Sequence, residues 1–156
     1  MQIDWKLDWK FLFLSFQGRI GRIYFWIAFL LLVGAGVVVQ LIPIVGQLIG
    51  FALLWPHLAI QAKRLHDIGR SAWLMAIPPA VTFVSVSLGA YIGGPTLIAA
   101  LNRNDSGAIA DLSRGLVVML LSVAIPLLIL AGFLLWIGLT RSQPRCNRYG
   151  PLPEVR

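Results

Sequence analysis

Residues 115–140 read GLVVMLLSVAIPLLILAGFLLWIGLT, a stretch without Asp, Glu, Lys or Arg. A helix needs roughly 20 largely apolar residues to cross about 30 Å of hydrocarbon, so this stretch predicts a transmembrane helix. Three more uncharged apolar stretches precede it, at residues 23–42, 44–62 and 72–100. A charge in the middle of a bilayer costs roughly 3 kcal/mol or more. The absence of charge from all four stretches therefore predicts four membrane spans.

The composition agrees with a membrane protein. Of the 156 residues, 58% are hydrophobic and 12% are charged, about half the charged fraction of a typical soluble domain. Disorder is excluded, because disordered chains are poor in apolar residues and rich in charge. The single cysteine, Cys146, rules out an internal disulfide. We expect an all-α fold, a polytopic membrane helical bundle with four transmembrane helices, in a single membrane domain over residues 1–156.

Short segments connect the expected spans. Pro43 separates the first two, residues 63–71 join the second and third, and residues 101–114 join the third and fourth. The last of these connections contains the turn signal Asn-Asp-Ser-Gly at 104–107. The third span contains Pro-Pro near its start and Gly-Gly-Pro at 93–95 near its end. These residues predict a kinked or partly broken helix.

The basic residues predict the orientation. Eleven of the thirteen lie in residues 1–22, 63–71 and 141–156, and only Arg103 and Arg114 lie in the third connection. Cytoplasmic loops collect Lys and Arg, so we expect both termini, including the tail 141–156, to be cytoplasmic. The same rule accounts for the net charge of +7. No nucleic-acid-binding motif accompanies that charge, so we expect no nucleic-acid partner.

The segment before the first span predicts an interfacial amphipathic helix within residues 3–16. Four apolar residues fall on one stripe at helical spacing, namely Trp5, Trp9, Leu12 and Phe16. Such a helix can lie in the headgroup layer. Apolar residues also alternate in this segment, which permits a strand, but the membrane span that follows favours the helix.

Three short motifs lie on the expected cytoplasmic side. The first box comprises Gly18, Arg19, Arg22, Phe25 and Trp26. The second box comprises Arg64, His66, Asp67, Gly69, Ser71 and Trp73. The third box comprises Asn147, Tyr149, Gly150 and Pro153. In order and placement, over roughly residues 16–153, they resemble the boxes of a small bacterial inner-membrane family known as domain of unknown function 805.

That family shows Gly-Arg-x-x-Arg-x-x-[Phe/Tyr]-Trp before its first span, Arg-x-His-Asp-x-Gly-x-Ser-x-Trp between spans, and often Asn-x-Tyr-Gly-x-x-Pro at its end. The Trp-rich start and the long third span of this chain depart from its pattern. The resemblance implies a multi-span protein of the bacterial inner membrane. It implies no activity, because the family is named for lacking one.

The boxes supply the candidate ligand site. Its residues are Arg19, Arg22, Arg64, His66, Asp67 and Arg70. The planar guanidinium group pairs well with phosphate and carboxylate. Our leading hypothesis is a non-enzymatic membrane protein that binds anionic lipid headgroups or a partner protein. The alternative is that the arginines only fix the topology and that Asp67 and Ser71 cap a turn.

A second hypothesis rests on His57, which follows Pro56 inside the second span. His57, Gln61 and Arg64 fall on one helical face, and an ionisable residue within a membrane is a functional candidate. A small oligomeric transporter or channel would place His57 and Gln61 along its path. The alternative is a neutral histidine bonded to Thr82, to Ser85 or to a carbonyl that Pro56 frees.

The sequence lacks a complete catalytic or metal-binding set. His57, His66, Asp67 and Cys146 are too few ligands at no recognised spacing. A nucleophile beside His66, either Ser71 or Cys146, lacks the pattern of a paired base. A lipid-modifying enzyme acting at the second box is therefore a third and weaker hypothesis, and we expect no metal or cofactor.

Two glycine pairs permit close contacts between helices. Gly46 and Gly50 are four residues apart, as are Gly89 and Gly93. Such pairs bring helices together within a fold or between subunits, so a homo-oligomer is one of the two interpretations.

Overall fold

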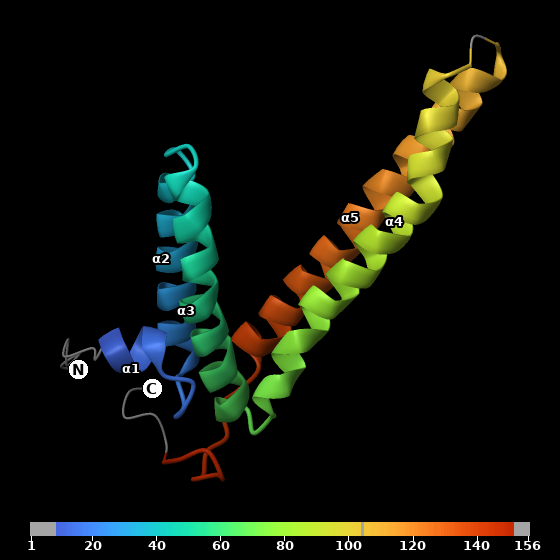
Figure 1. Ribbon diagram of the computed structural model, residues 1–156. Coiled ribbons are helices and arrows are strands. Elements are labelled where there is room, and N and C mark those ends of the chain that lie inside the picture. The colour runs from blue at the N-terminus through green and yellow to red at the C-terminus, as the bar shows by residue number, and fades with distance from the viewer. Residues whose placement is uncertain (1–8, 104, 152–156) are drawn as a thin grey trace. The chain divides into compact units, whose positions relative to one another are not determined.

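The computed structural model describes residues 9–103 and 105–151 (Figure 1). Its helices are α1 (Trp9–Leu14), α2 (Arg22–Val39), α3 (Val45–Asp67), the short 3-10 helix η1 (Ala72–Ala76), α4 (Ile77–Leu101) and α5 (Gly107–Leu139). Four helical segments are long and apolar enough to cross a membrane, namely α2, α3, α5 and the run of η1 and α4. The prediction of an all-α fold with four potential spans is confirmed.

The chain divides into two compact units. The first unit contains everything up to Met75 together with the chain from Leu135 onward, and so includes α1, α2, α3 and the last turn of α5. The second unit, Ala76–Leu134, contains α4 and most of α5.

In the first unit, α2 and α3 form an antiparallel pair (Figure 1). Phe25, Ala28 and Leu32 form the buried face of α2, because spacings of three and four residues keep side chains on one side of a helix. Ala59 and Ile60 are fully buried on α3. The opposite faces of both helices expose large apolar side chains, as expected where hydrocarbon replaces water.

α1 packs against α3 through its carbonyl end. The Lys63 ammonium donates to the carbonyl of Phe11 and, at 2.7 Å, to that of Leu12. The indole N–H of Trp55 donates to the carbonyl of Leu14 at 3.2 Å. These donors satisfy carbonyls that have no partner at the end of a helix. A helix is thus present over residues 9–14 of the predicted segment 3–16 and ends before Phe16, while the part of the prediction that includes Trp5 lies outside the described residues.

The second unit is an antiparallel pair of α4 and α5, which lie side by side in Figure 1. The two backbones approach closely at Gly89, where any Cβ atom would clash with the side chain of Ser122. A Cβ at Gly93 would press on Val118 and on the carbonyl of Gly115. The second predicted glycine pair therefore does serve close helix contact, and it does so within this hairpin.

The expectation of a partly broken third span is wrong at residues 93–95. α4 runs continuously from Ile77 to Leu101 and includes Pro95. Proline is tolerated inside apolar helices, and the hydroxyl of Thr96 donates to the carbonyl of Gly93 in the same turn at 2.7 Å. Pro78 and Pro79 lie in the first turn of α4, where proline's missing N–H is tolerated.

The expected connection at 101–114 is also too long, because α5 begins at Gly107. A charged residue marks the end of a membrane span, but it does not end the helix. α5 therefore begins before Asp111 and Arg114 and includes both residues. The guanidinium of Arg103 pairs with Asp111 at 2.6 Å. A carboxylate oxygen of Asp105 accepts the N–H of Gly107 at 3.0 Å and forms the turn. By the same logic α3 continues through the basic segment to Asp67, beyond the predicted limit of 62.

Candidate functional site

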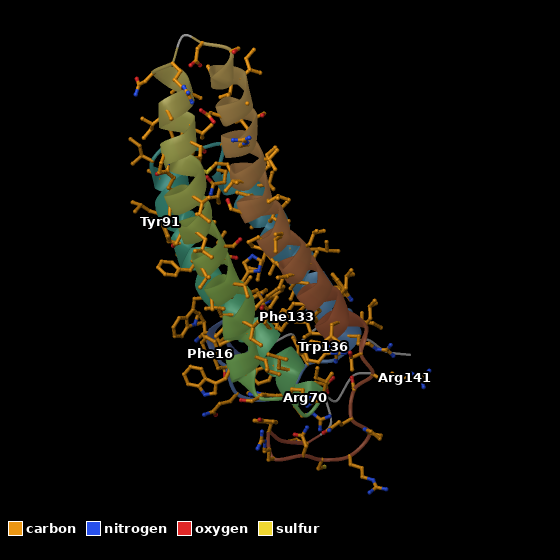
Figure 2. All side chains as sticks on the ribbon, turned by 90° about the vertical axis from the view of Figure 1, so that its right-hand side faces the viewer. Phe16, Arg70, Tyr91, Phe133, Trp136 and Arg141 are labelled. Atoms are coloured by element: carbon orange, nitrogen blue, oxygen red, sulfur yellow. The ribbon has the colours of Figure 1, made fainter. Side chains whose placement is uncertain are left out.

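Residues of all three boxes meet at one end of the first unit. This end comprises the start of α2, the end of α3, the end of α5 and the tail segment that follows it up to Pro151. Figure 2 shows Arg70 and Arg141 at this end, where the tail also lies. The sequence alone did not predict whether the three boxes lie close together, and the structure shows that they do.

At its centre, one carboxylate is shared by two guanidinium groups. Oδ1 of Asp67 lies 3.1 Å from Nη2 of Arg19, and Oδ2 pairs with Nη1 of Arg64. The side chains are 1% exposed for Arg19 and 0% for Arg64 and Asp67. We call these three residues the arginine clasp. Buried charges are stable only when they are paired and fully hydrogen-bonded, and no buried side-chain nitrogen or oxygen among the described residues lacks a partner.

Arg64 attaches the end of α5 to α3. Its Nε donates to the carbonyl of Ile137 at 2.8 Å, and its Nη2 donates to that of Thr140. Nη1 also donates to the hydroxyl of Ser142 at 3.2 Å. The last carbonyls of a helix carry the negative end of its dipole, so a buried cation is well placed there.

Arg19 attaches the tail. Its Nη2 donates to the carbonyl of Gln143 at 2.9 Å, and its Nη1 donates to those of Arg145 at 3.0 Å and Gly150 at 3.4 Å. The backbone N–H of Gln143 in turn donates to the carbonyl of Asp67 at 3.0 Å. The tail thus lies against the end of α3 mainly through its backbone.

A ring stack joins the second and third boxes. The rings of His66 and Tyr149 are parallel within 10° and their centroids are 3.9 Å apart. The side-chain amide of Asn147 donates to the carbonyl of His66 at 2.9 Å. Nδ1 of His66 lies 3.3 Å from the carbonyl of Gly18, which places the proton on Nδ1 in this bond. His66 therefore contacts both other boxes.

The backbone conformation explains why glycine occupies positions 18 and 69 in the first two boxes. Gly18 has φ +92° and Gly69 has φ +75°, in the region that side chains disfavour. A Cβ at Gly18 would also clash with the ring of Phe11, and one at Gly69 with the side-chain amide of Gln143. Both positions need glycine for their conformation, and Gly18 needs it also for space, whereas the exposed side chain of Gln143 can move away from Gly69.

The six candidate ligand residues thus divide into two groups. Arg19, Arg64 and Asp67 are buried and bound to one another, and His66 is half-buried in the ring stack. Arg22 and Arg70 are exposed. The buried guanidinium groups hold backbone carbonyls of the chain itself, so they present no free fork to an outside ligand in this conformation.

The remaining box residues are mainly structural. Phe25 is in the core, and the ring of Trp26 lies against Gly138. The hydroxyl of Ser71 accepts the N–H of Trp73 at 3.4 Å, which agrees with the capping alternative for Ser71. Trp73 is 84% exposed. Pro153 lies outside the described residues.

The intramembrane candidates His57 and Gln61 are both half-buried on α3. The ring of His57 meets that of Phe29 edge to face at 5.7 Å. The hydroxyl of Thr82, suggested above as a partner of His57, donates instead to the carbonyl of Pro78 in its own helix at 2.9 Å. Among the described residues no group of three His, Cys, Asp or Glu could hold a metal ion.

Sequence reasoning missed two residues of this end. Lys63 was counted only as a topological charge, yet its side chain is buried and holds α1. Its place directly before Arg64 and after an uncharged span was the available signal. Gln143 had no signal, because its backbone makes the contacts to Arg19 and Asp67.

Comparison with known proteins agrees with the boxes. A family model described as "Protein of unknown function (DUF805)" matches residues 13–151. The uncharacterized protein YiiR of Escherichia coli strain K12 is 39% identical over 124 residues, which cover 65% of this chain and 79% of the relative. YiiR of Escherichia coli O157:H7 matches to the same extent. No solved structure matches the chain.

Proposed function

Since the chain belongs to the DUF805 family, whose description assigns no activity, we propose a function from the geometry of its three boxes. The protein is a non-enzymatic component of the bacterial inner membrane, and its cytoplasmic end binds anionic lipid headgroups. The arginine clasp holds this end together, and the exposed arginines around the clasp bind the headgroups.

The observation that carries the proposal is an unbalanced positive surface. Five arginines of this end are exposed, namely Arg22, Arg70, Arg141, Arg145 and Arg148. In the described part of the first unit the sole carboxylate is that of Asp67, and it is buried between two guanidinium groups. No described acidic side chain of this unit therefore screens the exposed arginines.

Three of these arginines lie where headgroups are expected. Arg22 begins α2, Arg70 follows the end of α3 and Arg141 follows the end of α5. In the proposed orientation these helix ends reach the cytoplasmic leaflet, whose anionic lipids attract each Lys or Arg by about 1 kcal/mol. A guanidinium fork binds two oxygens of a phosphate at once. Attraction and geometry both favour anionic phospholipids.

The test compares lipid retention by matched variants. The first variant combines Arg22→Gln, Arg70→Gln and Arg141→Gln. The control combines Arg103→Gln and Arg114→Gln, which remove exposed arginines from the other end of the α4–α5 hairpin. Each protein is extracted from mixed phosphatidylglycerol and phosphatidylcholine membranes and analysed by native mass spectrometry.

We expect the first variant to retain several-fold less phosphatidylglycerol than the wild type, and the control to retain as much as the wild type. All five positions carry exposed charges, so the melting temperatures should agree and show that folding is intact. Equal retention of phosphatidylglycerol by all three proteins would overturn the proposal. A retained protein subunit in place of lipid would reassign the surface to a protein partner.

A further inference from the structure

We propose that the tail residues 143–150 act as a releasable strap over Arg19, and that the phosphate group of an anionic ligand displaces them. In the structure, carbonyl oxygens of the strap bind Arg19 at the positions that the oxygens of the anion would take. This inference rests on the proposed function, because it adds a second and regulated site to the same basic end.

The geometry around Arg19 resembles an occupied anion site. Carbonyl oxygens of Gln143, Arg145 and Gly150 converge on its two terminal nitrogens at 2.9, 3.0 and 3.4 Å. They belong to a segment without regular secondary structure beyond the turn at Asn147 and Gly150. A phosphate group presents several oxygens from one direction and with a negative charge, so it can replace these neutral acceptors with stronger, charge-assisted bonds.

The local charge favours an incoming anion. Arg19 and Arg64 share the single carboxylate of Asp67, which leaves the clasp with one positive charge in excess. The exposed Arg22 lies within electrostatic range of Arg64 and adds to this excess. Neutral carbonyls solvate the extra charge at present but do not neutralise it.

The strap is held mainly by polar contacts. The side chains of Gln143, Pro144, Arg145, Cys146 and Arg148 are all exposed. Besides the bonds to Arg19, the strap contacts the end of α3 through four features: the hydrogen bond from the backbone N–H of Gln143 to the carbonyl of Asp67, the side chain of Gln143 beside Gly69, the bond from Asn147 to the carbonyl of His66, and the ring stack of Tyr149 on His66. A segment that buries so few apolar side chains opens at low cost compared with a helix in the core.

An anionic membrane surface would act on both sides of the strap. It attracts the exposed Arg145 and Arg148 away from the end of α3. Its phosphate oxygens then bind the guanidinium of Arg19, which the strap has exposed. Release of the strap is therefore coupled to the binding of the ligand, and each step favours the other.

The experiment uses Cys146, the single cysteine of the chain, which is exposed within the strap. A nitroxide label at Cys146 reports the motion of the strap in lipid nanodiscs by electron paramagnetic resonance. Three conditions are compared: phosphatidylcholine alone, phosphatidylcholine with phosphatidylglycerol, and phosphatidylcholine with inorganic phosphate in the buffer. The control carries the label at Ser106→Cys in a Cys146→Ser background, in the α4–α5 connection.

We expect an immobile label in phosphatidylcholine and a growing mobile fraction as phosphatidylglycerol increases, with no change in the control. Release by inorganic phosphate alone would support the anion site and identify its source as soluble phosphate. A label that stays immobile in every membrane, in a protein that still retains phosphatidylglycerol, would overturn the strap and leave the proposed function standing. A label that is equally mobile in pure phosphatidylcholine would also overturn it.

A second measurement separates a ligand site from a purely structural contact. Tyr149→Ala removes the ring stack but keeps every arginine, and we expect it to raise the retention of phosphatidylglycerol several-fold. Adding Arg19→Gln to Tyr149→Ala should abolish this gain. A tail with a structural role alone predicts a lower melting temperature for Tyr149→Ala and unchanged lipid retention.

Discussion

Asp67 is the residue on which the basic end depends. Its two carboxylate oxygens bind two guanidinium groups from different elements, and its backbone carbonyl accepts the N–H of Gln143. Burying three charges costs solvation, so such a cluster adds little net stability over an apolar core of the same shape. Removing one partner is different, because it leaves the others buried without compensation.

Asp67→Asn should therefore destabilise the protein strongly. The amide cannot neutralise Arg19 and Arg64, so we expect a loss of about 3–5 kcal/mol. The matched control is Asp111→Asn at the α4–α5 tip, where the partner Arg103 is half exposed and the expected loss is less than about 1 kcal/mol. The midpoints of thermal unfolding in nanodiscs measure both. Equal midpoints for the two variants would show that the clasp is not a cooperative centre.

At the scale of elements, the ends of the helices do not coincide with the ends of the uncharged stretches. α3 and α5 extend past the ends of their uncharged stretches, to Asp67 and back to Gly107. The uncharged residues 115–139 of α5 measure roughly 37 Å at about 1.5 Å per residue, against roughly 27 Å for the 18 residues of α2. We therefore expect α5 to tilt within a hydrocarbon layer of about 30 Å or to extend beyond it.

The contact of α4 with α5 gives an element-scale prediction. Gly89→Leu places a branched side chain against Ser122, where even a Cβ atom clashes, so we expect a loss of about 1–3 kcal/mol from overpacking. Gly94→Leu is the matched control in the same helix, because no atom lies within 4 Å of a Cβ built there. Unfolding midpoints in mixed micelles should fall for the first variant alone. A similar fall for both would mean that helix propensity, and not the close contact, limits this hairpin.

At the scale of the whole molecule, four potential spans predict that the N-terminal segment and the tail lie on the same side of a membrane. The basic residues predict that this side is the cytoplasm, because eleven of the thirteen flank it. The tail and the α4–α5 connection should therefore face opposite compartments.

Cysteine labelling tests this orientation. Cys146 is exposed in the tail, so we expect a membrane-impermeant maleimide to label it in inverted inner-membrane vesicles and not in intact spheroplasts. The Ser106→Cys variant in a Cys146→Ser background should show the reverse pattern, because Ser106 is exposed in the connection between α4 and α5. Labelling of both positions from one side would contradict a membrane crossing by α5, the helix that separates them.

Several features of the protein follow from its sequence alone. The four apolar segments were predictable because the free energy of transferring a stretch into hydrocarbon depends on its own residues. The three boxes identified the family in advance, because their spacing is itself a sequence property. Helix ends were less accurate: the start of α5 at Gly107 was missed because charge marks the edge of a span and not the edge of a helix.

The tertiary structure alone decided what the arginines do. Nothing local distinguishes Arg19, which is buried, from Arg22, which is exposed three residues later. The difference arises because Asp67 and the carbonyls of the tail, 48 and more than 120 residues away, converge on Arg19. A guanidinium is stable in the interior only when such acceptors surround it, and long-range folding determines whether they do.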